Sequence, residues 1–229
     1  MSTPRVMFGG QRAPDPAPPA VPGCENVRRV WDSEYQRWAA RILPGEIFVT
    51  LHDELIATVV GSCIAVCVRD PVLRLGGMSL FMLPSRSRHA GGGSRSDAGG
   101  PAPLQGCFEL ERLIGEVVKL GADHSRLKAK MFGGSRNLSG VTDAGARTTA
   151  FVRQFLRQQG LPLVEEKIGD RHPRRIVYFP YSGTALVKRL SSRHSATVAN
   201  QETQYVDSLV LEPMTINLAP ESPASARRS

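Results

Sequence analysis

The feature that most constrains this chain is a pair of apolar runs separated by the tripeptide Gly61-Ser62-Cys63. Residues 56–60 and 64–68 are short and rich in β-branched side chains, which is typical of strands buried on both faces. A Gly-Ser pair between two strands permits a tight turn, and this turn presents a thiol. Cys63 is therefore either a nucleophile or a small buried hydrophobic residue, which is the commoner role of a free cysteine.

Further hydrophobic patterns predict one globular domain of mixed α/β or α+β type over about residues 43–190. Apolar residues recur with helical spacing at 108–120 and 148–159, and each of these predicted helices stops at a glycine. Short apolar runs predict strands at 47–50, 76–83, 127–132, 161–167, 175–179 and 184–188, the last two forming a hairpin. Strands interleaved with two main helices are typical of a single domain of this class.

The segments outside this domain, and one segment within it, are predicted to be loosely structured. Residues 1–25 are rich in proline, so we expect a disordered N-terminal tail. Residues 26–42 carry apolar side chains at helical spacing, which predicts a short amphipathic helix. Residues 85–103 are dense in Ser, Arg and Gly and predict a mobile loop, and residues 191–229 predict a largely disordered C-terminal extension.

Charge and composition argue against several classes of function. The net charge is +8, but the arginines are scattered without interleaved aromatic residues, so we expect no nucleic-acid binding; a basic surface also suits an acidic partner protein. No apolar run reaches the roughly 18 residues of a membrane span, which predicts no membrane insertion and a cytoplasmic location. The four cysteines form no close pair and no histidine cluster has metal-ligand spacing, so neither a metal nor another cofactor is expected.

A series of motifs resembles the CheD family, the chemoreceptor glutamine deamidases of bacterial chemotaxis. The likeness covers about residues 43–190 and is carried by the segments 43–46 (LPGE), 60–67 (VGSCIAVC), 69–71 (RDP), 76–78 (GGM), 81–84 (FMLP), 128–134 (KAKMFGG), 151–160, 173–175 and 182–183. Residues 202–209 also resemble the family's C-terminal extension. One such motif alone would be weak evidence for the family, whereas the whole series in this order is specific to it.

The resemblance implies a fold, an activity and partners. The fold would be a CheD-like single domain in which a β-sheet sandwich is flanked by helices. The activity would be hydrolysis of selected glutamine side-chain amides on methyl-accepting chemotaxis receptors, giving glutamate and ammonia. The family's phosphatase partner, CheC, would be a second protein partner.

The resemblance also implies roles for individual residues. Cys63 would be the nucleophile, since a thiolate can add to a carboxamide carbon once its pKa is lowered. Thr58 would assist it, although the register also permits a match at Ala57. The loops around the substrate would be formed by Gly61, Ser62, Phe132, Gly133 and Gly134.

One position departs from the family pattern. The family has a histidine that pairs with the nucleophilic cysteine, and Leu80 stands in its place. Leucine can neither accept the thiol proton nor donate one to the departing ammonia. A positioned acid–base group increases the rate by about 10²–10⁴-fold, so we expect its replacement by leucine to lower turnover.

Two other histidines are candidate substitutes for the missing base. His52 precedes the strand that leads to Cys63, and His89 follows the strand that carries Leu80. The histidines that we expect in ordinary surface turns are His124, His172 and His194. The sequence leaves two hypotheses open: a glutamine deamidase, or a catalytically weakened relative that binds receptors or the phosphatase.

Overall fold

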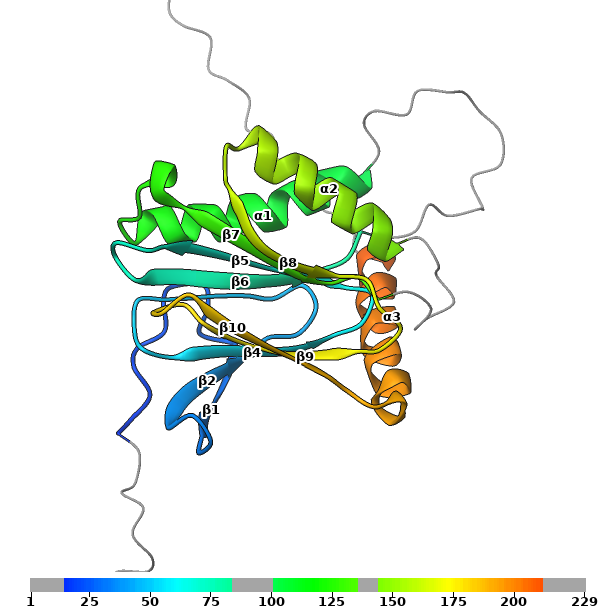
Figure 1. The fold of residues 1–229 in the computed structure, drawn as a ribbon, viewed down its shortest axis with the longest axis horizontal. Coiled ribbons are helices and arrows are strands. Elements are labelled where there is room, and N and C mark those ends of the chain that lie inside the picture. Colours follow the sequence, from blue (N-terminus) through cyan, green and yellow to red (C-terminus); the bar gives the residue numbers. More distant parts are fainter. Residues whose placement is uncertain (1–14, 84–100, 136–143, 212–229) are drawn as a thin grey trace, which may run out of the picture.

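Two β-sheets stacked face to face form the body of the protein (Figure 1). The computed structural model describes residues 15–83, 101–135 and 144–211. In spatial order, the first sheet contains β1 (Arg28–Asp32), β2 (Arg37–Arg41), β4 (Leu55–Val60), β9 (Arg174–Phe179) and β10 (Thr184–Arg189). The second sheet contains β3 (Ile47–Thr50), β6 (Leu75–Phe81), β5 (Ile64–Asp70), β7 (Lys128–Gly133) and β8 (Leu163–Ile168).

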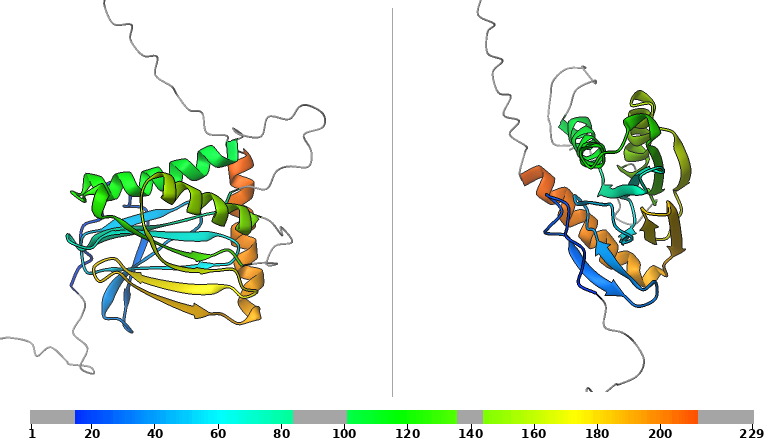
Figure 2. Two further views of the ribbon diagram at one scale, coloured as in Figure 1. Left: turned by 45° about the horizontal axis from the view of Figure 1, so that its top comes forward. Right: turned by 90° about the vertical axis from the view of Figure 1, so that its left-hand side faces the viewer.

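Three α-helices flank this sandwich within the described residues, which confirms the predicted fold class. The helices α1 (Pro101–Lys119) and α2 (Ala144–Gln158) cover the outer face of the second sheet, and α3 (Ser195–Leu211) runs along one end of both sheets (Figures 1 and 2). Short 3-10 helices occupy His124–Arg126 and Ser192–His194. No helix in the described part of the chain is long and apolar enough to cross a membrane.

Two large groups of buried apolar side chains hold the layers together. One group, which includes Val66 and Leu113, lies between the second sheet and the helices α1 and α2. The other group lies between the two sheets and includes Ile56, Cys63 and Leu80. Because alternate residues of a strand point to opposite faces, the second sheet contributes side chains to both groups.

The turn Gly61-Ser62-Cys63 carries the chain from one sheet to the other. β4 pairs with β2 and β9 in the first sheet, whereas β5 pairs with β6 and β7 in the second. The two strands predicted on either side of the turn are confirmed. Cys63 therefore lies where the two layers join, at the end of the sandwich along which α3 runs (Figure 2).

The predicted helices and the C-terminal hairpin are also present. α1 contains most of the helix expected at 108–120 but already begins at Pro101, where proline is favourable in a first turn. α2 contains most of the helix expected at 148–159, and β9 and β10 form the expected hairpin. Residues 101–103 of the predicted mobile loop are thus helical, and the rest of that loop lies outside the described residues.

The predicted helix at 26–42 is wrong, because this segment forms the antiparallel hairpin β1–β2. Asp32 Oδ1 accepts hydrogen bonds from the amides of Glu34 and Tyr35 and thereby forms the turn. Trp31 and Trp38 pair across the strands with ring centroids 5.9 Å apart. Cross-strand aromatic contacts and the parallel pairing of β2 with β4 override the helical spacing of the apolar residues.

The prediction of a largely disordered C-terminal extension is wrong for residues 195–211, which form α3. The N-terminal prediction is wrong for residues 15–25, where Cys24 is buried and Trp38 Nε1 donates to the carbonyl of Asp15 at 3.0 Å. Both segments are held by contacts with residues distant in the sequence, which local composition does not reveal. Residues 1–14 and 212–229 lie outside the described residues.

Candidate active site at the crossover between the sheets

The crossover turn is held by backbone hydrogen bonds from the segment that follows β7. The amide of Gly134 donates to the carbonyl of Cys63 at 3.0 Å, and the amide of Ser135 donates to the carbonyl of Gly61 at 2.7 Å. A Cβ at Gly133, which has a φ of +116°, would lie 2.2 Å from the Cys63 carbonyl oxygen. The two segments predicted as substrate loops thus lie side by side, but Phe132 and Gly133 belong to strand β7 rather than to a loop. Gly133 is required for the close approach of the two segments.

Three consecutive backbone amides of the turn bind one carboxylate, that of Glu202 on α3. Glu202 Oε1 accepts from the amide of Gly61 at 2.8 Å and from the amide of Cys63 at 2.9 Å. Glu202 Oε2 accepts from the amide of Ser62 at 2.8 Å. Successive amides that converge in this way form an anion-binding concavity, so the turn is a site for a negatively charged oxygen.

The thiol of Cys63 is fully buried, and its protonated form is favoured. Burial raises the pKa of the Cys63 thiol well above its usual value, and the charge of Glu202 and its hydrogen bond with the thiol raise it further. Because the thiolate is the nucleophilic form, the thiol as it lies in this structure is poorly reactive.

One face of α3 packs against the sandwich. Val198 and Glu202 are buried, and Tyr205 and Val206 are half-buried, at the three- and four-residue spacing of a single helix face. Tyr205 and Val206 pack against the apolar group between the sheets. The only acidic residue among these four is therefore the one that reaches the amides of the crossover turn.

The LPGE turn at 43–46 lies between α3 and the strand that carries Leu80. A Cβ at Gly45 would lie 2.7 Å from Cε2 of Tyr205, so the aromatic ring rests directly on this glycine. The amide of Gly45 donates to the carbonyl of Leu80 at 2.7 Å, and the amide of Leu80 donates to the carbonyl of Glu46 at 3.2 Å. This turn therefore connects the docking surface of α3 to the position of the expected histidine.

Leu80 and Phe132 share the inter-sheet apolar group with Cys63, and all three are fully buried. Leu80 pairs with Ala65 in the neighbouring strand, and alternation places Ala65 on the same face as Cys63. A side chain at position 80 thus points into the layer that holds the thiol. Leucine at this position carries no titratable group, and a pairing of position 80 with the thiol stays a prediction.

Thr58 and Ala57 lie on opposite faces of β4. Thr58 shares the inter-sheet face with Ile56 and Val60, whereas Ala57 belongs to the apolar group on the outer face of the first sheet. The Thr58 hydroxyl donates to the carbonyl of Ile42 at 2.8 Å. Of the two positions that could match the family's assisting threonine, only Thr58 faces the layer that contains the thiol. Its assisting role stays a prediction.

None of the histidines in the described residues hydrogen-bonds to Cys63. His52 precedes β4, and this strand of six residues separates it from the crossover turn by about 20 Å. The carbonyl of His172 accepts from Ser135 Oγ at 2.9 Å, which places its backbone near the turn, but its side chain is exposed. His89 lies outside the described residues.

Two polar atoms near α3 are buried without a hydrogen-bond partner, Oε2 of Glu109 on α1 and the hydroxyl of Tyr205. Burial raises the pKa of the Glu109 carboxyl to about 7, and Arg112 opposes this shift. Burial raises the pKa of Tyr205 as well, and the charges of Glu109 and Cys63 contribute to this shift. Glu109 on α1 thus lies close enough to Tyr205 on α3 for its charge to affect that residue.

Glu109 should make stability depend on pH between about 4.5, its ordinary pKa, and about 7. A raised folded-state pKa means that the folded protein binds the proton more tightly, so Glu109 destabilises the fold progressively as pH rises through this range. We expect Glu109→Gln, a neutral isostere, to melt at a higher temperature than wild type at about pH 8 and to lose this advantage at about pH 4.5. Thermal unfolding of both proteins across this range measures the difference, and a pH-independent difference would contradict it.

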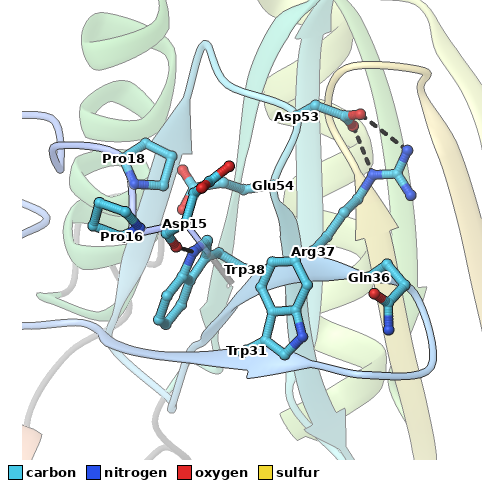
Figure 3. A pocket seen from close by; sticks show the side chains of 9 residues that line it. All are labelled: Asp15, Pro16, Pro18, Trp31, Gln36, Arg37, Trp38, Asp53 and Glu54. Carbon is cyan, nitrogen blue, oxygen red and sulfur yellow. Dashed lines mark hydrogen bonds and ion pairs between the residues drawn. The ribbon is translucent and has the colours of Figure 1, made fainter. Parts of the chain in front are cut away.

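The surface depression in Figure 3 is separate from the Cys63 site. It is lined by the hairpin β1–β2, by residues 15–18 and by the turn before β4, at the opposite end of that strand from Gly61. Two of its three acidic side chains have ion-pair partners: Asp53 with Arg37 at 2.9 Å, and Glu54 with Arg29 at 3.1 Å. Among the described residues, no group of three or more His, Cys, Asp or Glu side chains is arranged to bind a metal ion.

The sequence reasoning missed Glu202, although one signal pointed to it. The spacing of Val198, Glu202, Tyr205 and Val206 fits one face of a helix, with a single carboxylate among apolar residues. A charged residue within the buried stripe of a helix requires a specific partner. The partner lies some 140 positions earlier in the chain, and no local pattern shows it.

Comparisons with known proteins agree on one family. A family model described as CheD chemotactic sensory transduction matches residues 82–189. The probable chemoreceptor glutamine deamidase CheD of Hahella chejuensis is 41% identical over 203 residues, which cover 89% of this chain and 94% of the relative. The proteins of the same name from Halorhodospira halophila and Saccharophagus degradans are 41% and 40% identical, over 86% and 85% of this chain and 91% and 90% of each relative.

Likeness to solved structures is weaker. The hypothetical protein YfiH of Bacillus licheniformis covers 55% of this chain and 51% of its own, with 15% identity and a TM-score of 0.37. The sequence relatives, in contrast, match 85% to 89% of this chain. This chain belongs to the CheD family.

Proposed function

We propose that this protein is a chemoreceptor glutamine deamidase in which Cys63 is the nucleophile. The observation that carries the proposal is the juxtaposition of a thiol with three convergent backbone amides that bind a carboxylate. The CheD relatives, named as probable chemoreceptor glutamine deamidases, support the choice of substrate. The carboxylate is also the functional group that the reaction would produce.

The reaction follows from these groups. The Cys63 thiolate adds to the carboxamide carbon of a glutamine side chain, and the amides of Gly61, Ser62 and Cys63 stabilise the oxyanion. The carbon–nitrogen bond then breaks, and the nitrogen takes up a proton and leaves as ammonia. Water attacks the resulting thioester, which restores the thiol and releases a glutamate carboxylate and a proton. The net change is glutamine amide plus water to glutamate plus ammonium.

The substrates that we propose are the cytoplasmic parts of methyl-accepting chemotaxis receptors, which implies that the enzyme works in the cytoplasm. The net charge of +8 favours association with an acidic protein surface. A CheC-type phosphatase is the second partner implied by family membership. Isothermal titration with purified CheC measures this contact separately from catalysis.

Mass spectrometry of a purified receptor cytoplasmic fragment tests the deamidase proposal directly. We expect wild-type protein to convert specific glutamines to glutamate and Cys63→Ala to convert none, because no other group in the site forms the thioester. Cys67→Ala is the matched control. Cys67 is as fully buried as Cys63 and belongs to the same inter-sheet apolar group, but it lies four residues further along the chain. Equal conversion by wild type and Cys63→Ala would show that Cys63 is not the nucleophile.

Leu80 is the specific observation that favours a second function, in which the protein binds receptors or the phosphatase without efficient chemistry. The same experiment separates the two functions. Receptor binding with no conversion at enzyme concentrations equal to the substrate would indicate the binding role. Glutamine conversion that depends on Cys63 would show that the protein is an enzyme. It would also show that a residue other than Leu80 acts as the base.

A further inference from the structure

We propose that α3 is an internal inhibitor of the Cys63 site, in which Glu202 occupies the place of the reaction's carboxylate product. The proposal rests on the deamidase function proposed above. It predicts two forms of the protein: a closed form with Glu202 in the amides of the turn, as in this structure, and an open form in which α3 has left them.

Glu202 has the same functional group as the reaction product. The group bound by the three amides is the side-chain carboxylate of a glutamate, and a glutamate side chain is what hydrolysis of a substrate glutamine produces. Both oxygens of Glu202 are used, at 2.8 to 2.9 Å from the amide nitrogens of Gly61, Ser62 and Cys63. A substrate carbonyl oxygen needs the same amides, so substrate and Glu202 cannot bind together.

The docked helix α3 also blocks access to the thiol. Glu202 is 1% exposed and Cys63 is 0% exposed, so α3 closes the site from solvent at this end of the sandwich. The negative charge of Glu202 also holds the pKa of the thiol high, which keeps the sulfur protonated and unreactive. Each of these effects inhibits the reaction: Glu202 occupies the amides, α3 excludes the substrate, and the thiol stays protonated.

The closed form leaves two buried polar groups without hydrogen bonds. The hydroxyl of Tyr205 on α3 and Oε2 of Glu109 on α1 are buried without hydrogen-bond partners. In the open form these groups could form hydrogen bonds with water. Their burial without partners costs free energy in the closed form and so weakens the docking of α3. The stripe that docks combines one buried valine with half-buried residues, so the helix is attached by a small apolar surface.

A different role for Glu202, as a general base that replaces the missing histidine, fits these contacts less well. A base must leave the oxyanion site free, whereas both oxygens of Glu202 fill it. A base must also favour the thiolate, whereas the charge of Glu202 disfavours it. The two roles predict opposite effects of removing the carboxylate, which makes them separable.

The test compares the full-length variants Glu202→Ala and Val198→Asp with wild type. Val198 is 4% exposed on the docking face of α3 but does not touch the amides, so Val198→Asp displaces the helix by a different route. Gln201→Ala is the matched control, because Gln201 is the exposed neighbour of Glu202. Alkylation of Cys63 by iodoacetamide is followed by peptide mapping, and circular dichroism verifies that each variant is folded.

We expect Cys63 to be alkylated at least about tenfold faster in Glu202→Ala and Val198→Asp than in wild type, because a fall of one pKa unit gives tenfold more thiolate. Gln201→Ala should match wild type. Conversion of receptor glutamines should rise in the same two variants. Should Glu202→Ala not fold, Glu202→Gln removes the charge with a smaller change of shape.

Three results would overturn the proposal. The first is unchanged alkylation in both folded variants, and the second is faster alkylation in Glu202→Ala alone, which would indicate a local effect of charge without helix release. The third is slower alkylation with loss of glutamine conversion in Glu202→Ala, which would make Glu202 the base. Faster alkylation in both variants without conversion by any protein would support the closed form and contradict the deamidase function.

Discussion

Replacing Leu80 with histidine is expected to raise the rate of glutamine conversion by about 10²–10⁴-fold, the usual contribution of a positioned acid–base group. The side chain at position 80 points into the layer that holds the Cys63 thiol, and both residues are fully buried in the same inter-sheet group. An imidazole there can accept the thiol proton and return one to ammonia. The reaction needs both transfers, and leucine supplies neither.

The effect should be largest when the site is open. In the closed form Glu202 holds the amides of the turn, so a histidine at position 80 activates a thiol that substrate cannot reach. We therefore expect Leu80→His to increase conversion more in a Glu202→Ala background than in the wild-type chain. The double-variant cycle measures this coupling between Leu80 and Glu202.

Leu80→Asn is the control for Leu80→His. Asparagine also introduces a polar side chain at a fully buried site, but it cannot exchange a proton near neutral pH. Both variants should lose thermal stability, because each buries a polar group in an apolar layer. An equal gain in turnover from both would contradict acid–base catalysis, and a pH–rate profile with a new pKa near 6.5 only in Leu80→His would support it.

The parts of the fold predicted from sequence are those set by local pattern. The two apolar runs around Gly61-Ser62-Cys63 predicted the strands that meet at the crossover, since β-branched runs and a Gly-Ser turn act over a few residues. The helices α1 and α2 were predicted from the spacing of their apolar residues. Motifs shared with a family predicted that Cys63, Gly133 and Leu80 belong to one site.

The parts that were not predicted depend on partners distant in the sequence. The hairpin at 28–41 has helical spacing, and it becomes two strands because β2 pairs with β4 in the first sheet. Residues 200–204 in the middle of α3 are all polar, so the local pattern does not predict a packed helix on its own. Its docking depends on the bonds between Glu202 and the turn at Gly61, and the covering role of α3 follows only from these contacts.

Gly133→Ala is expected to destabilise the protein by about 3 kcal/mol or more, through a strained backbone and a direct clash. Gly133 has a φ of +116°, a region that side-chain-bearing residues rarely adopt, and its added Cβ would lie 2.2 Å from the carbonyl oxygen of Cys63. The nearest atom, the carbonyl oxygen of Cys63, is a backbone atom and cannot move aside as a flexible side chain would. For a chain of this size the loss corresponds to a fall in melting temperature of about 10 °C.

Gly160→Ala separates strain from clash. Gly160 has a φ of +67°, and nothing lies within 4 Å of the position of its Cβ, so alanine there should cost only about 1 kcal/mol. The clash at Gly133 can be relieved only by moving the Cys63 carbonyl, which shifts the three amides that hold Glu202. Gly133→Ala should therefore also change the alkylation rate of Cys63, whereas Gly160→Ala should not. Equal losses of stability from the two substitutions would mean that β7 and the crossover turn are not in the close contact on which the candidate site depends.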